Sequence, residues 1–112
     1  MSSAFQRDSS VVADSTRPGR FFAHLPATWA APTVPQGGIS LAAATRAMQT
    51  AIGDVAMSLR SVSCVFAAPV EAGDVDIDVT VLRQGRSVAQ ALATMRTPGA
   101  VHCCACSLQE YL

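Results

Sequence analysis

An alanine-rich stretch that opens on a glycine pair and closes at Gly53 constrains the fold of this chain most. At helical spacing its apolar residues share one broad face, and Arg46, Gln49 and Thr50 lie with Gly53 on a narrow polar stripe opposite. Gly53 also suits the left-handed position that follows many helices. The stretch 38–53 therefore predicts a helix that is covered by protein around most of its circumference. The residues expected to face inward are Leu41, Ala44, Ala47, Met48, Ala51 and Ile52.

The segments on either side of this helix have the patterns of β-strands. Alternating apolar and polar residues between clusters of turn formers predict two short strands before the helix and three or four after it. The later strands read as an antiparallel meander, so the chain predicts an α+β domain in which an antiparallel sheet curls around one long helix. The expected strands are 11–13, 20–25, 60–66, 74–82, 88–96 and 100–107.

The register of the hairpin 74–96 can be argued from side-chain alternation. The inward residues of both strands carry odd numbers, so the numbers of directly opposed residues must have an even sum. A three-residue loop, 84–86, meets this condition, places Asp74 opposite Arg96, and requires a left-handed conformation at Gly85 or a neighbour. The inward pairs are then expected to be Val75–Met95, Ile77–Ala93, Val79–Ala91 and Val81–Ala89.

The amino-terminal end of the predicted helix is its chemically suggestive end. The first N–H groups of a helix have no partner inside it, and no Ser, Thr, Asp or Asn stands close before Ile39 to cap them. Gly37 and Gly38 carry no side chain, so a ligand can approach the backbone there. Such an end favours negative charge, including a developing oxyanion. Two interpretations stay open, namely a ligand site and a glycine bend that only turns the chain into the helix.

The cysteines give a weaker signal. Cys103 and Cys106 have C-x-x-C spacing, but strand alternation puts Cys104 and Cys106 on one face and Cys103 on the other. Only Cys64 remains as a fourth zinc ligand, and the spacing is not the paired, turn-borne kind. A redox pair would need the C-x-x-C at a helix start. Small apolar strand residues are therefore the favoured interpretation.

The histidines and acidic residues suggest no site of their own. His24 and His102 fall on predicted strands with no acidic residue at a telling spacing, and a nucleophile pair of His102 with Cys104 is the weaker alternative. Three acidic residues alternate with Val and Ile, which favours a solvated strand face over a cation site. They are Asp74, Asp76 and Asp78.

The composition bounds the class of protein. The 112 residues suffice for one domain, and a chain that is 50% hydrophobic and 14% charged is expected to be globular. Eight basic residues balance eight acidic ones, so nothing indicates a nucleic-acid partner. No apolar run approaches the roughly 20 residues of a membrane span. With no recognisable signal peptide, a cytoplasmic location is expected.

A series of short motifs runs through residues 19–106. They are Gly19-Arg20-Phe21, Trp29, Pro35-Gln36-Gly37-Gly38, Arg46-Ala47-Met48, Leu59-Arg60-Ser61, Val65 to Val70, Gly73-Asp74 and Val81 to Ser87. Taken together, they resemble the amino-terminal half of the double-hotdog acyl-CoA thioesterases, the thioesterase II type. The glycine pair alone is a weak motif, but its combination with the Phe-x-x-Pro bend and the Leu-Arg-x-Gly-Arg-Ser turn is more specific.

The resemblance implies a hotdog fold and hydrolysis of an acyl-CoA thioester where two hotdogs meet, with no cofactor and no metal. Gly38, with Gly37, carries over as the backbone donor to the thioester carbonyl. Ser61 stands where the family pattern has Asp, and the family's Gln falls near Ser107. The residues expected to bind substrate are Gln36, Arg83, Gly85, Arg86 and Ser87. From their chemistry alone, the two arginines either hold a phosphate or form an ordinary charged turn.

The expected organisation is a flexible segment 1–8, a single hotdog domain 9–107, and a tail 108–112 that departs from the family's usual continuation, as a truncated product would. Two functions follow from the resemblance. One is a thioesterase that acts as a homodimer or with a second hotdog. The other is a catalytically silent hotdog that binds acyl-CoA or serves as a scaffold. The acidic, Ser or Thr, and Gln residues of the family's catalytic set belong mainly to a second half that this sequence does not contain, which keeps both open.

Overall fold

The computed structural model describes residues 4–26, 37–68, 73–97 and 102–112, and these residues form one sheet, one long helix and one short helix. The helices are α1 (Ala4–Asp8) and α2 (Gly37–Ile52). The strands are β1 (Val11–Ala13), β2 (Arg20–Leu25), β3 (Ser58–Phe66), β4 (Gly73–Gln84), β5 (Val88–Arg96) and β6 (His102–Tyr111). No helix among these residues is long and apolar enough to cross a bilayer.

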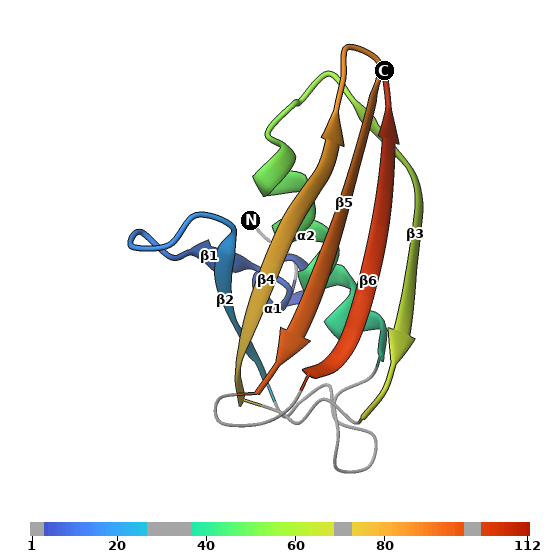
Figure 1. Ribbon diagram of the computed structural model, residues 1–112. Helices are drawn as coiled ribbons and strands as arrows, with labels where there is room; N and C mark the ends of the chain where they lie inside the picture. Colours follow the sequence, from blue (N-terminus) through green and yellow to red (C-terminus); the bar gives the residue numbers. More distant parts are fainter. Residues whose placement is uncertain (1–3, 27–36, 69–72, 98–101) are drawn as a thin grey trace.

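The six strands form one antiparallel sheet in the order β1-β2-β4-β5-β6-β3. Figure 1 shows this sheet curling around α2, with β3 at one edge and the short β1 at the other. The helix and β3 run in opposite directions, so α2 begins at the end of the sheet where β3 ends. The predicted antiparallel sheet around one long helix is confirmed. The predicted meander of the later strands is wrong for β3, because this strand pairs with β6 and not with β4.

The helix has the boundaries and the inward face that its sequence predicts. Gly53 follows it with φ +71°, and the Gly53 N–H donates to the Gln49 carbonyl at 2.9 Å, which is the expected left-handed ending. Its buried face meets inward residues of the central strands, many of them alanines that let the two layers come close. The buried residues of both layers include Ile39, Ala43, Ala44, Ala47, Met48, Ile52, Ile77, Ala89, Ala91, Ala93 and Met95.

The predicted register of the β4–β5 hairpin is wrong by two residues. Ile77 lies opposite Met95, and the Gly85 N–H donates to the Val88 carbonyl at 2.8 Å, which closes a tighter turn than expected. Gly85 is not among the described glycines with positive φ. The cause is a bulge between Val81 and Arg83, which adds one residue to β4 and changes the parity on which the argument depended.

Two of the three acidic residues of β4, Asp74 and Asp76, have ionic partners on neighbouring strands, and Asp74 is also exposed to solvent as predicted. Asp76, and not Asp74, lies opposite Arg96, and it accepts a 2.7 Å hydrogen bond from Arg20 on β2. That bond is the main reason why the pKa of Arg20 is raised above its usual value. Asp74 lies 2.9 Å from the Nδ1 atom of His24, and both of these side chains are exposed.

Both ends of the chain are more ordered than the sequence suggests. Ala4–Asp8 form α1 where a flexible segment was expected. At the other end, residues 108–111 are not a tail, because β6 continues through Tyr111. The continuation follows strand alternation: Leu108 and Glu110 are buried, like Cys106 before them. The continuation was not predicted because Glu110, a charged residue, occupies a position where an inward-facing strand residue is expected to be apolar.

Gly19 lies so close to the backbone of β4 that a larger residue does not fit there without strain. Its φ is +83°, and a Cβ atom added there would lie 2.7 Å from the Val79 carbonyl oxygen. We expect Gly19→Ala to lower the free energy of unfolding by about 2–4 kcal/mol, because backbone strain and steric overlap add. Urea unfolding measures the loss. Gly85→Ala is the matched control, since its Cβ would meet the nearest atom at 3.5 Å; equal losses in both variants would contradict the explanation.

Candidate functional site

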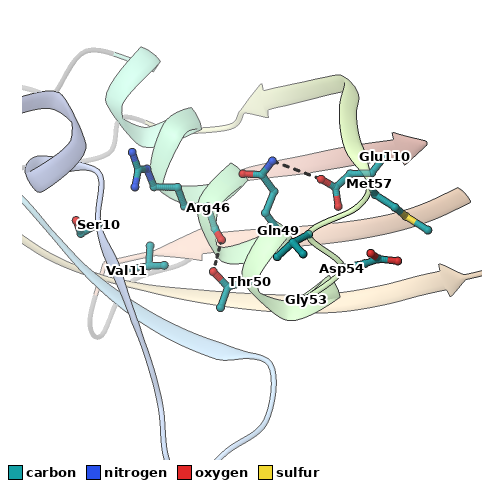
Figure 2. Close-up of a pocket in the computed structure, with 10 residues that line it drawn as sticks. Ser10, Val11, Arg46, Gln49, Thr50, Gly53, Asp54, Met57 and Glu110 are labelled. Atoms are coloured by element: carbon teal, nitrogen blue, oxygen red, sulfur yellow. Dashed lines mark hydrogen bonds between the residues drawn. The ribbon is translucent and has the colours of Figure 1, made fainter. Parts of the chain in front are cut away.

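The polar stripe of α2 faces the largest described pocket, about 720 Å³ in volume. Figure 2 shows Arg46, Gln49 and Thr50 projecting from the helix into it, with β1 on one side and β6 behind. The sheet covers the apolar face of α2, so this stripe is the part of the helix that remains open to a ligand. The pocket is lined by Ser10, Val11, Arg46, Gln49, Thr50, Gly53, Asp54, Val55, Met57 and Glu110.

Glu110 is the most unusual residue of this pocket. It is only 3% exposed, and the Gln49 amide Nε2 donates to its Oε2 at 3.4 Å. Glutamate is seldom buried to this extent without a partner or a role. A carboxylate oriented by an amide in a pocket can hold a water molecule and accept its proton. This pair could not be predicted from the sequence, because its members are 61 residues apart.

Arg46 brings positive charge to the same pocket. Its side chain is half-buried, and no carboxylate of the described residues lies within ion-pair distance of it. Its carbonyl oxygen accepts the Thr50 hydroxyl at 2.7 Å, which keeps the neighbouring polar side chain against the helix. The pocket therefore presents a cation from α2 and a buried carboxylate from β6.

The helix start, the predicted oxyanion site, lies at the other end of α2. Gly37 is its first residue, and Gly38 is exposed. In the same turn Ser40 is fully buried, and its hydroxyl oxygen has no hydrogen-bond partner among the described residues. Leaving a buried hydroxyl without a hydrogen bond costs about 1–3 kcal/mol of stability. The first turn of α2 therefore contains an unsatisfied polar side chain in addition to backbone N–H groups that have no partner within the helix.

Ser61 lies on the outer face of the sheet, away from the helix start. It is exposed and lines a shallow pocket of about 210 Å³ that also contains Ser107. The Ser107 hydroxyl is hydrogen-bonded to the hydroxyl of Ser63, at 2.9 Å. The structure thus places Ser61 and Ser107 in one pocket, but it does not bring Ser61 to Gly38 within one chain.

The predicted substrate-binding turn also lies far from the helix start of its own chain. Arg83, Gly85, Arg86 and Ser87 are all exposed at the β4–β5 turn, which Figure 1 places at the end of the sheet where α2 ends. The Gln84 amide joins this turn to the helix end by donating to the Ile52 carbonyl at 2.8 Å. Ile52, which contacts this turn, lies 14 residues after Gly38 along α2 (52 − 38), which corresponds to about 21 Å at 1.5 Å per residue. Gln36, the remaining candidate, lies outside the described residues.

The interpretation of the cysteines as simple apolar residues is wrong for two of them, Cys64 and Cys106. Cys64 on β3 and Cys106 on β6 are directly opposed and form a disulfide. Cys104 and Cys106 are both buried, so the prediction that they share a face is confirmed. The pairing was missed because it depends on the register between β3 and β6, which are not consecutive strands.

The comparison with protein families decides what this arrangement belongs to. The pattern of the acyl-CoA thioesterase N-terminal domain matches residues 25–109, which is most of the chain and includes both ends of α2. The chain belongs to this family. The resemblance seen in the short motifs is therefore confirmed. No functionally curated protein sequence matches the chain.

Solved structures show that this acyl-CoA thioesterase N-terminal domain has the hotdog fold. A candidate thioesterase II from Thermobifida fusca aligns with a TM-score of 0.86 and 21% identity, over 96% of this chain and 38% of the other. A hot dog protein from Alicyclobacillus acidocaldarius aligns with a TM-score of 0.86 and 20% identity, over 99% and 40%. A Bacillus halodurans protein solved with CoA has a TM-score of 0.74 and 11% identity, over 83% and 66%. The chain spans about two fifths of the length of the first two relatives.

Proposed function

We propose that this acyl-CoA thioesterase N-terminal domain binds an acyl-CoA thioester and hydrolyses it at a site completed by a second hotdog unit. The observation that carries the proposal is the division of candidate groups within one chain. The helix start lies at one end of α2, whereas Glu110 and the arginine turn lie at the other. Family membership and the related protein solved with CoA support the choice of substrate class.

The edge strand β3 provides a surface for that second unit. Among the described strands, none pairs with its outer side, and Leu59, Val65 and Phe66 are 43%, 71% and 46% exposed. The Cα atoms of Cys64 and Cys106 are 4.1 Å apart, which is the spacing of a pair that exchanges no backbone hydrogen bonds. The N–H groups of Val62 and Cys64 therefore point to the open edge, where another strand can accept them.

Pairing two copies through β3 brings the separated groups together. A two-fold antiparallel pair of β3 strands turns the second unit end for end. The partner's Gly38 then comes to the end of this chain's sheet where β3 begins. Glu110 lies there, opposite Leu59 and one strand from the edge, and the β4–β5 turn is at the same end. This is the site that we propose.

In the proposed site, each group has a separate role in the hydrolysis of the thioester. Glu110, oriented by Gln49, accepts a proton as a water oxygen bonds to the thioester carbonyl carbon. The N–H groups at the partner's Gly38 stabilise the resulting oxyanion. The carbon–sulfur bond then breaks, the departing sulfur takes the proton from Glu110, and a carboxylic acid and the CoA thiol are left. Arg83 and Arg86, on their exposed turn, suit the phosphate groups of CoA.

The experiment removes pairing without removing the fold. Val62→Pro deletes an N–H that faces the open edge, a position at which strands tolerate proline. Val62→Ala makes a comparable loss of packing but keeps the N–H. We expect the wild type and Val62→Ala to be dimers that hydrolyse acyl-CoA, and Val62→Pro to be a folded monomer with little turnover. Sedimentation and a thiol-release assay measure both. A monomeric wild type with full turnover would contradict the shared site.

The second candidate function is a hotdog that binds acyl-CoA without hydrolysing it. The specific observation in its favour is Ser61, which stands on the outer face where the family pattern has an acidic residue. The same assay separates the two functions. A dimer that binds acyl-CoA in calorimetry but releases no thiol would support the binding role and exclude hydrolysis by this chain alone.

A further inference from the structure

Three cysteines gather inside the sheet near the end where β3 finishes and β6 begins. Cys64, Cys104 and Cys106 have sulfur atoms that all lie within 4.8 Å of one another. Cys104 and Cys106 are 1% and 2% exposed, and Cys64 is half-buried. Three sulfurs bound to one ion at about 2.3 Å each lie at most about 4.0 Å apart, so the sulfurs must move together by less than about 1 Å for one ion to contact all three.

Two of these sulfurs are bonded to each other in the structure, and Cys104 lies outside that disulfide. A dithiol reductant opens it by transferring two electrons and two protons to the Cys64 and Cys106 sulfurs, and is itself oxidised to a disulfide. The reduced chain then holds three thiols in one cluster. The disulfide and an ion-binding cluster are therefore alternative states of the same three residues.

The surroundings of the cluster restrict which ion can bind. Cys104 lies opposite Phe66 on one side and Met95 on the other, and Cys106 lies opposite Cys64 and Ala93. None of these neighbours carries a charge that could balance a charged complex, and net charge is costly in an apolar interior. Three thiolates around Zn²⁺ leave one negative charge, and around Cu⁺ they leave two. Three thiolates bound to trivalent arsenic leave none.

We propose that the reduced chain has a three-thiol binding site, Cys64–Cys104–Cys106, for a trivalent thiol-seeking ion such as arsenite. One arsenous acid and three thiols give one As(SR)₃ group and three waters, so three arsenic–oxygen and three S–H bonds are replaced, with no change of oxidation state. Thiolate ligands select soft ions of this kind. Cys64 is the most exposed of the three and provides the entry point, and the two buried thiols then displace the remaining oxygens one at a time.

The test compares arsenite binding by the reduced full chain with binding by the oxidised chain and by single Cys→Ala variants. Native mass spectrometry gives stoichiometry, and thiol titration counts the thiols that arsenite protects. The reduced wild type has four thiols and is expected to bind one arsenic and to keep one reactive thiol. Cys103→Ala is the matched control and should bind one arsenic with no reactive thiol left. The oxidised chain should bind none.

Loss of a residue that only hydrogen-bonds to a metal ligand typically weakens metal binding by roughly 10- to 100-fold. Removing any cysteine of the cluster, which would be a direct ligand, should weaken arsenite binding by at least as much. Thermal unfolding of each apo variant shows that it is folded. Full-strength binding by folded Cys104→Ala would overturn the three-thiol site, because the other two cysteines would then suffice. Tighter 1:1 binding of Zn²⁺ than of arsenite to the reduced wild type would overturn the charge argument.

Discussion

Gly38→Pro is expected to lower kcat for acyl-CoA hydrolysis by about 10²- to 10³-fold while leaving the fold intact. Proline removes one of the N–H groups at the helix start, and loss of a single oxyanion donor typically costs that much. The first turn of a helix accepts proline, because its N–H has no partner inside the helix and its φ already suits the helix. The measurement is kcat and KM by thiol release, together with circular dichroism and the dimer fraction.

Gly38→Ala separates the N–H group from the bare surface around it. This variant keeps the donor and adds one methyl group at an exposed position, so its kcat should stay within a few-fold of wild type. If alanine lowered kcat as much as proline, close approach to the backbone and not the N–H group would explain the glycine. If neither variant changed kcat, the helix start would have no part in the reaction.

Glu110→Gln is expected to lower kcat by about 10²- to 10⁴-fold, which is the range for loss of a general base. The change preserves shape, and the new amide oxygen can still accept the hydrogen bond that Gln49 donates at 3.4 Å. It removes only the ability to take a proton from water. KM should change little, because the carboxylate acts on water and does not hold CoA. Steady-state kinetics provides both constants.

Asp54→Asn is the matched control for that variant. Asp54 lines the same pocket, but its carboxylate accepts the N–H of Ala56 at 3.0 Å and is not held by Gln49. We expect its turnover to equal that of the wild type. Equal losses in the two variants would mean that the pocket needs negative charge in general, and an active Glu110→Gln would remove Glu110 from the mechanism.

Most of the fold was predictable because it depends on local pattern. Glycine signals and helical spacing gave the end of α2 at Gly53, and alternation gave β2 and β5 with their observed bounds. Side-chain alternation predicted correctly which residues face inward, but it gave a wrong register, since one bulged residue at Leu82 is invisible in a repeat of apolar and polar letters. The resemblance, which depends on ordered motifs, led directly to the family.

The candidate site was only partly predictable, because its members are joined by tertiary contacts. Gly37 and Gly38 could be identified from local chemistry, whereas Glu110 stood in a segment interpreted as a tail. The burial of Glu110 depends on the continuation of β6 beyond Ser107 and on the contact of its carboxylate with Gln49 of α2. The Cys64–Cys106 pair likewise depends on strand order. Such long-range pairs leave no trace in the spacing of one sequence.

The alanine-on-alanine contact between α2 and the central strands has a consequence for the acyl tail. Ala43 and Ala47 are fully buried against strands whose inward positions include Ala91 and Ala93. Small side chains let the two layers approach closely, and close-packed interiors admit no extra methylene groups without strain. A fatty acyl chain therefore cannot thread between helix and sheet of one unit. If acyl-CoA is the substrate, as proposed, its hydrocarbon would lie outside the space between α2 and the sheet of one unit, and the residues that bound this outer position would limit the acyl chain length.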